Sequence, residues 1–508
     1  MILIRIVLTA DRSLMSTYSD NIYIGFLSCL PNKICPEVLF NRFCPPIPAN
    51  SDGTTTYPIL ALRTVESICV NAGFQDTKIA HPDYLDKVIN SKTKIVGVSC
   101  EDPLGIGPAT TSWSSVFNGI PHNRIKFVQL MKKIRELKEK FHFKVILGGP
   151  GCWQFNEAKM KKLGIDYLLP GEGERSIPPF FQSILDGEAP SQPIQPEASI
   201  PNGEEILPIL GPTNSRFIEI SRGCGRGCKF CGPTTSGQIR NFLIDKIIAD
   251  AKVYLKYGIK DIVLQSEDTL RYGSTKKDFS IDIDIIINLY ETLFALGLKR
   301  ISITHASLIN FAEQSEEIVK FTQYLHKNGT RYFGCQPGIE TGSPRLMRKY
   351  MKGKCYPRSP EEWQEIVFDA LQVMNENRWY PVCTLILGLP DEEDYDILLT
   401  IELIQKIDKF PALYIPLFFV PMSMTSLRER EKFVSEKMTA LQWKLLLTCW
   451  KHNIKYIFNL YKLGASPKGS FQLISKVLIT ALKFLIHYKG SRMVNKKYHE
   501  KISIAKQR

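Results

Sequence analysis

Short apolar runs alternate with amphipathic stretches over the first 195 residues of this 508-residue chain. The apolar runs predict buried strands at Ile2–Leu8, Lys94–Ser99, Lys144–Leu147 and Asp166–Leu169. Helical spacing of hydrophobic residues predicts helices at Ile59–Val70 and Ile125–Phe141. This alternation predicts an α/β domain of Rossmann-like type, with a parallel, doubly wound sheet that binds ligands at the carboxyl ends of its strands.

The second half of the chain repeats the alternation after a stretch, residues 188–215, that is rich in proline and polar residues. Predicted strands are Phe217–Ile220, Asp261–Leu264, Arg300–Thr304, Tyr332–Gln336, Cys383–Leu387 and Leu413–Val420, with a first helix at Asn241–Tyr257. Six such units predict a partial (β/α)6 barrel, too short to close as an eight-stranded barrel does. The predicted organisation is a domain at 1–195, a linker at 196–213, the barrel at 214–430 and a basic helical region at 431–508.

Three cysteines lie in the loop after the first of these strands, Ser221–Gly232, which reads SRGCGRGCKFCG. Cys224, Cys228 and Cys231 have a C-x3-C-x2-C spacing, and the glycines between them permit tight turns. A closed zinc site uses four ligands, and electron-transfer clusters use four cysteines. Three thiolates instead predict a four-iron cluster with one iron open to a substrate or cofactor; a zinc site or an oxidised thiol loop is the alternative.

This loop resembles the cluster loop of radical S-adenosylmethionine (SAM) enzymes, including Phe230 before the last cysteine. The resemblance implies a 4Fe-4S cluster on Cys224, Cys228 and Cys231, with SAM bound to the open iron. It also implies an electron donor such as ferredoxin or flavodoxin. We therefore expect Phe230 to belong to the cofactor site.

Three later segments resemble the SAM-binding segments of the same family. QSED after the second barrel strand implies that Glu267 holds the SAM amino group, although the usual glycines are absent and a helix N-cap is the alternative. GIETGSP implies that Glu340 binds the ribose, and a solvated turn is the alternative. LGLPDEE implies that backbone at Gly388 approaches the adenine. No residue is selected as catalytic.

The first domain resembles the cobalamin-binding domain of one radical SAM class, mainly in IDYLLPGEGE and a GGPG turn. That family's D-x-H-x-x-G motif is absent, and the first histidine, His81, is in a different context. Cobalamin binding is therefore left open, with a scaffold domain as the alternative. Whether Cys29, Cys35 and Cys44 hold a further metal is also left open, with ordinary buried cysteines as the alternative.

Composition limits the compartment and the partners. Thirteen cysteines are too few for a disulfide scaffold in a chain of this length, and the cluster loop needs free thiols, so we expect a reducing, cytoplasmic location. We find no signal peptide and no apolar run long enough to span a membrane. The net charge is +14, and eight of the nine charged residues from Lys483 onward are basic. With the helically spaced apolar residues of 471–486, this tail suggests peripheral contact with an anionic membrane; a helix packed on the barrel is the alternative.

Within the class, LTADRSLMS, EDPLGIGPATTSW and GPTTSG look most like archaeal tetraether lipid (GDGT) ring synthases. The resemblance implies hydrogen abstraction from unactivated carbon of a membrane lipid chain and formation of cyclopentane rings. One alternative is a cobalamin-dependent radical SAM methyltransferase. Another is an Fe-S nucleic-acid-binding protein, but basic residues are not interleaved with stacking aromatics, and we expect no nucleic-acid partner.

Overall fold

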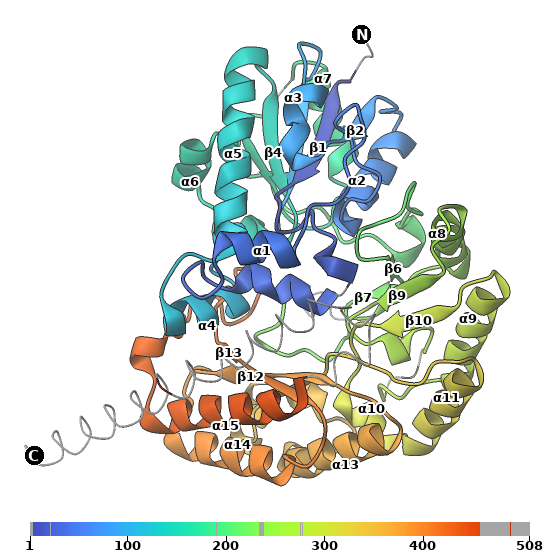
Figure 1. Cartoon of the computed structure of the whole chain (residues 1–508), viewed down its shortest axis with the longest axis vertical. Coiled ribbons are helices and arrows are strands. Elements are labelled where there is room, and N and C mark those ends of the chain that lie inside the picture. Colours follow the sequence, from blue (N-terminus) through green and yellow to red (C-terminus); the bar gives the residue numbers. More distant parts are fainter. Residues whose placement is uncertain are drawn as a thin grey trace, which may run out of the picture. The chain divides into compact units, whose positions relative to one another are not determined.

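A computed structural model (Figure 1) describes residues 4–457 except 21, 189, 233–237, 275 and 277, and also residue 488. By its internal packing the chain divides into two compact units. Unit 1 contains residues 1–220, 242–263 and 293–299, and unit 2 contains 221–241, 264–292 and 300–508.

Unit 1 is built on a five-stranded sheet in the order β2-β1-β3-β4-β5. Its strands are β1 (Ile6–Ala10), β2 (Thr77–Ile79), β3 (Ile95–Ser99), β4 (Lys144–Gly148) and β5 (Tyr167–Leu169), and every pairing is parallel. Its helices are α1 (Glu37–Phe43), α2 (Leu60–Asn71), α3 (Leu85–Val88), α4 (Pro108–Phe117), α5 (His122–Phe141), α6 (Glu157–Leu163), α7 (Ile177–Leu185) and α8 (Ile244–Lys256). The predicted parallel α/β fold is confirmed, although the three-residue strand β2 was not predicted.

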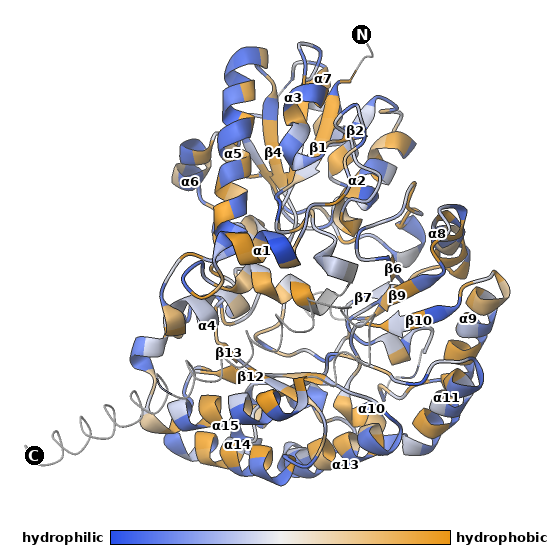
Figure 2. Ribbon diagram, viewed as in Figure 1, coloured by the Kyte–Doolittle hydropathy of each residue, from blue (hydrophilic) through white to orange (hydrophobic). Residues whose placement is uncertain are grey.

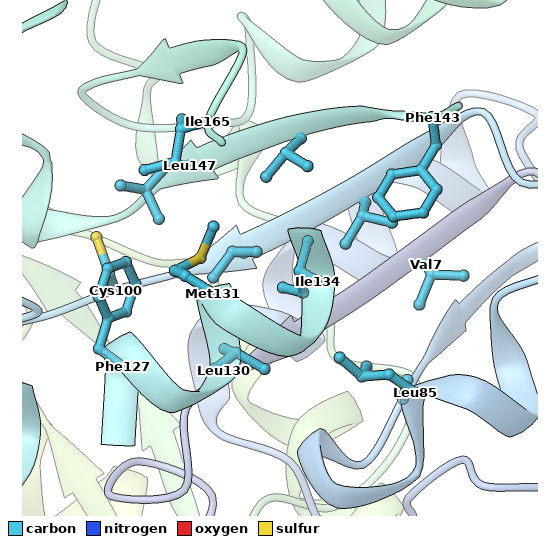
Figure 3. Packing of buried hydrophobic residues seen from close by; sticks show 14 of the residues in the cluster. Val7, Leu85, Cys100, Phe127, Leu130, Met131, Ile134, Phe143, Leu147 and Ile165 are labelled. Atoms are coloured by element: carbon cyan, nitrogen blue, oxygen red, sulfur yellow. The ribbon is translucent and has the colours of Figure 1, made fainter. Parts of the chain in front are cut away.

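Helices cover both faces of this sheet because successive strand residues point to opposite sides. Val7 of β1 packs on one side with α3 and α5, in the cluster that Figure 3 shows around Phe127 and Ile134. Its neighbours Ile6 and Leu8 pack on the other side with α2 and α7. Figure 2 shows hydrophilic and hydrophobic residues along α5, and the residues of this helix that are buried include Phe127, Leu130 and Ile134.

The segment predicted as a linker is anchored along unit 1. Ser67 Oγ donates to the Pro208 carbonyl at 2.6 Å, and Arg63 Nε donates to the Pro212 carbonyl at 3.2 Å. Ile206 and Ile209 are buried. The domain boundaries stay predictions, but residues 196–213 pack as part of unit 1.

The barrel half contains the strands β6 (Phe217–Glu219), β9 (Asp261–Gln265), β10 (Arg300–Ile303), β11 (Gly338–Glu340), β12 (Val382–Leu387) and β13 (Leu413–Phe418). They form two three-stranded sheets, β10-β9-β6 and β11-β12-β13, and the division between the units falls within β9. One backbone hydrogen bond joins the segment after β10 to the segment before β11: the Gln336 N–H donates to the Thr304 carbonyl at 2.8 Å. The remaining helices are α9 (Ile283–Ala295), α10 (Leu308–Glu313), α11 (Ser315–Lys327), α12 (Pro344–Tyr350), α13 (Trp363–Glu376), α14 (Asp394–Lys406) and α15 (Ala440–Tyr456).

Two local predictions in this half are wrong. Tyr332–Gln336 forms no regular strand. Phe333 makes an isolated bridge to Trp379, and Pro337 has no N–H with which to continue the pairing. The helix predicted from Asn241 begins at Ile244, because Arg240 and Asn241 form the short strand β8 against β7 (Ser221–Arg222). The apolar segment 471–486 and nearly all of the basic tail lie outside the described residues. In the part of the chain that is described, no helix is long and apolar enough to cross a membrane.

Candidate active site

The three-cysteine loop begins where β7 ends. Gly223, Gly225 and Gly227 have φ values of 79°, 72° and 68°, a region that residues with a side chain rarely adopt. The loop therefore makes the tight turns that its glycines predict. The Cys231 N–H donates to the Cys228 carbonyl at 3.1 Å, which closes the last turn.

Cys224, Cys228 and Cys231 lie on this one loop and are in no disulfide. Burial raises the pKa of Cys228 to about 11, and the Lys354 ammonium acts in the opposite direction. Among the described residues no three cysteine, histidine or acidic side chains lie close enough together to hold a metal ion, so their side chains would have to turn toward one another to ligate one. Three cysteine thiols on a backbone that turns at glycines, with cationic side chains nearby, fit a 4Fe-4S cluster with one open iron.

Buried arginines hold the loop, and sequence reasoning did not identify them. Arg271 Nη1 donates to the Cys224 carbonyl at 2.8 Å. Arg226, inside the loop, pairs with Asp268 at 3.3 Å, and Ser307 Oγ donates to the same carboxylate at 2.7 Å. The sequence gives a signal for Arg226 alone, because it lies between two of the cysteines. Asp268 and Arg271 are distant from the loop in the chain, and only the fold brings them to it.

Glu267, predicted to hold the SAM amino group, lies at the loop. Its Oε2 accepts a hydrogen bond from the Gly223 N–H at 2.8 Å. Glu267 is not the N-cap residue of the alternative interpretation. The N-cap position of the short 3-10 turn that follows is occupied by Asp268, whose side chain makes no capping hydrogen bond. His305, a further residue after β10, donates from Nδ1 to the Ser266 carbonyl at 3.2 Å, and burial lowers its pKa. These contacts place Glu267 beside the cysteines and give His305 a structural partner.

Glu340 lies at the end of β11 with φ +65° and is 6% exposed. Lys354 Nζ pairs with its Oε1 at 2.5 Å, and Thr384 Oγ1 donates to its Oε2 at 3.3 Å. A side chain at Gly338 would overlap both Glu340 and Lys354. Glu340 is therefore a fixed, buried carboxylate and not the solvated turn residue of the alternative interpretation.

The turn after α12 packs against the cysteine loop. The Lys229 N–H donates to the Tyr350 carbonyl at 2.9 Å, and Arg226 Nη1 donates to the Gly353 carbonyl at 3.3 Å. A Cβ at Gly353 would overlap the Arg226 carbonyl oxygen. The segment that carries Lys354 thus lies directly against backbone of the cysteine loop.

Gly388 directly follows β12 with φ +77°, and a Cβ there would overlap the ring of Phe433. Its N–H donates to Glu392 Oε2 at 2.9 Å, and Gln442 Nε2 donates to the same oxygen at 2.7 Å. Burial raises the pKa of Glu392 to about 7. In this structure the ring of Phe433 lies against backbone at Gly388, and the predicted approach of the adenine there stays a prediction.

Phe230 is half-buried on the loop, and the structure gives it no further contact that tests its predicted role. Met424 is 37% exposed and reaches Gly232, where a Cβ would overlap its sulfur. Two of the predicted site residues of unit 2 therefore come together at the loop, Glu267 directly and Glu340 through Lys354. Met424, which the sequence analysis did not select, reaches the loop at Gly232. Gly388 lies at its own strand end.

In unit 1, the loops at the carboxyl ends of β1, β3 and β4 carry Asp11, Cys100 and the GGPG turn. Gly149 has φ +99°, and a Cβ there would lie 2.5 Å from the Cys100 carbonyl, so the turn requires glycine. His81 is 1% exposed, and its Nε2 lies 3.0 Å from the Ile47 carbonyl. Cys29, Cys35 and Cys44 are free, with pKa values that burial raises to about 12, 11 and 12, and they belong to no metal-binding group among the described residues.

Residues 218–404 match the family model described as Radical SAM superfamily. Two curated relatives are tRNA-modifying enzymes by name. Threonylcarbamoyladenosine tRNA methylthiotransferase MtaB of Aquifex aeolicus is 24% identical over 54% of this chain and 63% of its own length. tRNA-2-methylthio-N(6)-dimethylallyladenosine synthase of Fusobacterium nucleatum is 26% identical over 55% of this chain and 62% of its own length. The chain thus spans less than two thirds of the curated relatives it matches.

Solved structures match a larger share of the chain. The radical S-adenosylmethionine methyltransferase TsrM of Kitasatospora setae, with cobalamin and a [4Fe-4S] cluster bound, has a TM-score of 0.53 at 14% identity over 84% of this chain and 77% of that chain. The cobalamin-dependent S-adenosylmethionine radical enzyme OxsB, with aqua-cobalamin bound, has a TM-score of 0.52 at 14% identity, over 91% of this chain and 57% of that chain. The chain therefore contains a radical SAM domain and, over most of its length, has a fold that resembles cobalamin-dependent radical SAM enzymes.

Proposed function

We propose that this protein is a radical SAM enzyme whose cluster is held by Cys224, Cys228 and Cys231. The observation that carries the proposal is the loop with three cysteines, none of them in a disulfide, in a domain that matches the superfamily. Members of that superfamily use a 4Fe-4S cluster and SAM. When bound, the reduced cluster supplies the electron that cleaves SAM to methionine and a 5′-deoxyadenosyl radical, which can take hydrogen from unactivated carbon.

The chain's own residues bind and orient SAM. We assign the ribose hydroxyls to Glu340, because Lys354 and Thr384 already fix its carboxylate, and a buried carboxylate pairs well with two hydroxyls. We assign the SAM amino group to Glu267, which is beside the loop. The adenine approaches backbone at Gly388, where Phe433 must move aside or stack on the base.

The direct test is release of 5′-deoxyadenosine by anaerobically reconstituted protein with SAM and a strong reductant. Cys228→Ala should abolish it, because the cluster loses one of three ligands. Cys449→Ala is the matched control, a buried cysteine in α15 of the same unit. Equal product from wild type and Cys228→Ala would contradict the proposal.

The finer proposal concerns the substrate. We infer that the radical acts on a membrane lipid chain and forms cyclopentane rings, as in tetraether lipid ring synthases. Two of the segments that resemble those enzymes, Leu8–Ser16 and Glu101–Trp113, include the loops that leave the neighbouring strands β1 and β3. Parallel sheets bind ligands at this edge. Joining two saturated carbons removes two hydrogen atoms, which two SAM cleavages account for, each using one electron from the donor.

The substrate proposal is tested by deleting the gene and profiling core lipids by mass. We expect lipids with fewer cyclopentane rings, each ring lost adding two hydrogen atoms to the mass. Complementation with the wild-type gene should restore the rings, and complementation with the Cys228→Ala gene should not. Unchanged ring numbers in the deletion strain would remove the lipid proposal and leave the enzyme class untouched.

Peripheral membrane contact forms part of this proposal. The chain carries a net charge of +14 with a basic end, which favours anionic headgroups. Co-sedimentation with anionic vesicles should exceed that with neutral vesicles and fall as salt is raised, because exposed charges are screened. Equal binding to both kinds of vesicle would contradict an electrostatic contact.

A second candidate is cobalamin-dependent methyl transfer, favoured by the fold likeness to cobalamin-bound structures in the comparison. A corrinoid at the carboxyl edge of the unit 1 sheet would be bound without His81, whose ring is engaged with Ile47 and Asp83. Retention of a corrinoid after anaerobic purification, with methyl transfer from a second SAM, would favour this candidate. Ring formation without a corrinoid would exclude it.

A further inference from the structure

Arg271 is a buried guanidinium against the first cysteine of the loop. The residue is 4% exposed, and its Nη1 donates to the Cys224 carbonyl at 2.8 Å. The ring of Phe279 covers it, with 4.6 Å between the guanidinium carbon and the ring centroid. Its Nε has no hydrogen-bond partner among the described residues.

Two other cations near the loop have carboxylate partners, and Arg271 has none within ion-pair distance among the described residues. Arg226 pairs with Asp268, and Lys354 pairs with Glu340. Within the described part of the chain no carboxylate lies within ion-pair distance of Arg271, and Asp268, already paired, acts on it only from farther away. A buried charge without a counter-charge is costly, and proteins normally pair it.

We propose that Arg271 is a positioning residue that holds Cys224 and whose charge is balanced by the iron-sulfur cluster on the loop. This inference rests on the proposed function, because the counter-charge is the cluster itself. A cubane carried by three thiolates is anionic, and it becomes more so when it takes up an electron. Arg271 therefore stabilises the loaded loop over the empty one and the reduced cluster over the oxidised one.

A buried arginine could instead serve only to bind the carboxylate of SAM. Experiments without SAM distinguish the two roles, because only a residue that acts on the cluster changes them. We would reconstitute wild type, Arg271→Met, Arg271→Lys and Arg358→Met anaerobically with iron and sulfide. Arg358 is the matched control, an arginine of unit 2 that pairs with Glu313 at 2.5 Å. The readouts are iron and sulfide per chain, the midpoint potential from an EPR-monitored titration, and the rise in melting temperature on cluster loading.

We expect Arg271→Met to lose at least half of its iron and to shift the potential of the remaining cluster to more negative values. Its melting temperature should rise less on loading than that of wild type, because a ligand that binds the variant more weakly stabilises it less. Arg271→Lys keeps the charge and should recover the potential, while Arg358→Met should match wild type in all three readouts.

Wild-type iron content, potential and thermal shift in Arg271→Met would overturn the inference and leave the proposed function standing. An equal loss in Arg358→Met would also overturn it, because the effect would then be general. If Arg271→Met does not fold, Arg271→Lys decides. The lysine variant should keep the wild-type midpoint potential, and a shift of its potential to more negative values would contradict the charge role. A wild type that takes up no cluster overturns the proposed function and, with it, this inference.

Discussion

At the scale of single residues, Glu340 shows how one ion pair can fix a strained position. Its φ of +65° is unfavourable for a residue with a side chain, by about 1 kcal/mol. The carboxylate is held by Lys354 and Thr384, in a space that only glycine at position 338 leaves open. The orientation of this predicted SAM ligand thus depends on a lysine 14 residues away.

Lys354→Met should destabilise the fold by about 3 kcal/mol, because it leaves the Glu340 carboxylate buried without its partner. Lys352→Met is the control, since Lys352 is exposed two positions away and should change stability by less than about 0.5 kcal/mol. Denaturant unfolding of the two variants measures both. Equal stability of the two variants would show that the buried pair contributes nothing.

At the scale of elements, the strand-to-helix connections of unit 2 are shaped by positions where a side chain does not fit. Gly388 follows β12 in a left-handed conformation under the ring of Phe433, and the turn at Gly353 lies against the cysteine loop. Glu392 then ties the Gly388 N–H to Gln442 of α15. The loop after β12 is therefore fixed at Gly388, where it starts, and at Glu392, whose carboxylate binds both the Gly388 N–H and Gln442.

Gly388→Ala should lower the free energy of unfolding by about 3 kcal/mol, because the left-handed backbone and the overlap with Phe433 both disfavour a side chain there. Gly329→Ala is a matched control at φ +86° with no atom within 4 Å of the added Cβ, so it should cost only about 1 kcal/mol. Thermal melting compares them. The interpretation fails if Gly329→Ala is as damaging as Gly388→Ala.

The same loop predicts a pH dependence. Burial raises the pKa of Glu392 to about 7, above the 4.5 expected when unfolded, so the folded state binds the proton more tightly. Stability should therefore fall as pH rises from about 4.5 to about 7, by an amount of order 3 kcal/mol. Glu392→Gln should remove this part of the pH profile of unfolding. An unchanged profile in that variant would assign the dependence to other groups.

At the scale of the whole molecule, the segment between the two predicted domains is an ordered part of unit 1. Arg63, on α2, donates to the Pro212 and Thr56 carbonyls and pairs with Glu66 at 2.6 Å. Ile209 N–H donates to Asp250 of α8 at 2.9 Å. A proline-rich composition here gives a fixed path and not a free hinge.

Arg63→Ala should make this segment about tenfold more sensitive to a protease that cleaves after glutamate, because losing charge-assisted hydrogen bonds of about 1.5 kcal/mol favours local opening. Glu197 and Glu204 provide cleavage sites there. Arg135→Ala, an exposed arginine on α5, is the control. If both variants are cleaved at the wild-type rate, Arg63 does not anchor the segment.

Much of the architecture was determined by local sequence pattern. Strands such as Lys144–Gly148 and the turns at Gly223, Gly225 and Gly227 follow from apolar runs and from backbone that only glycine readily adopts. The spacing of the three cysteines also identified the cofactor class. These features depend on residues close together in the chain, which is why sequence alone predicts them.

Tertiary structure decided the surroundings of the cysteine loop. Arg271 lies 47 residues from Cys224, and Arg226 meets Gly353 across 127 residues, so no local pattern marks either contact. Likewise, Tyr332–Gln336 resembles a strand locally, but Pro337 lacks the N–H that would continue its pairing, and no regular strand forms. Charge balance and strand pairing depend on which distant segments the fold brings together, and that information is absent from any single stretch of the chain.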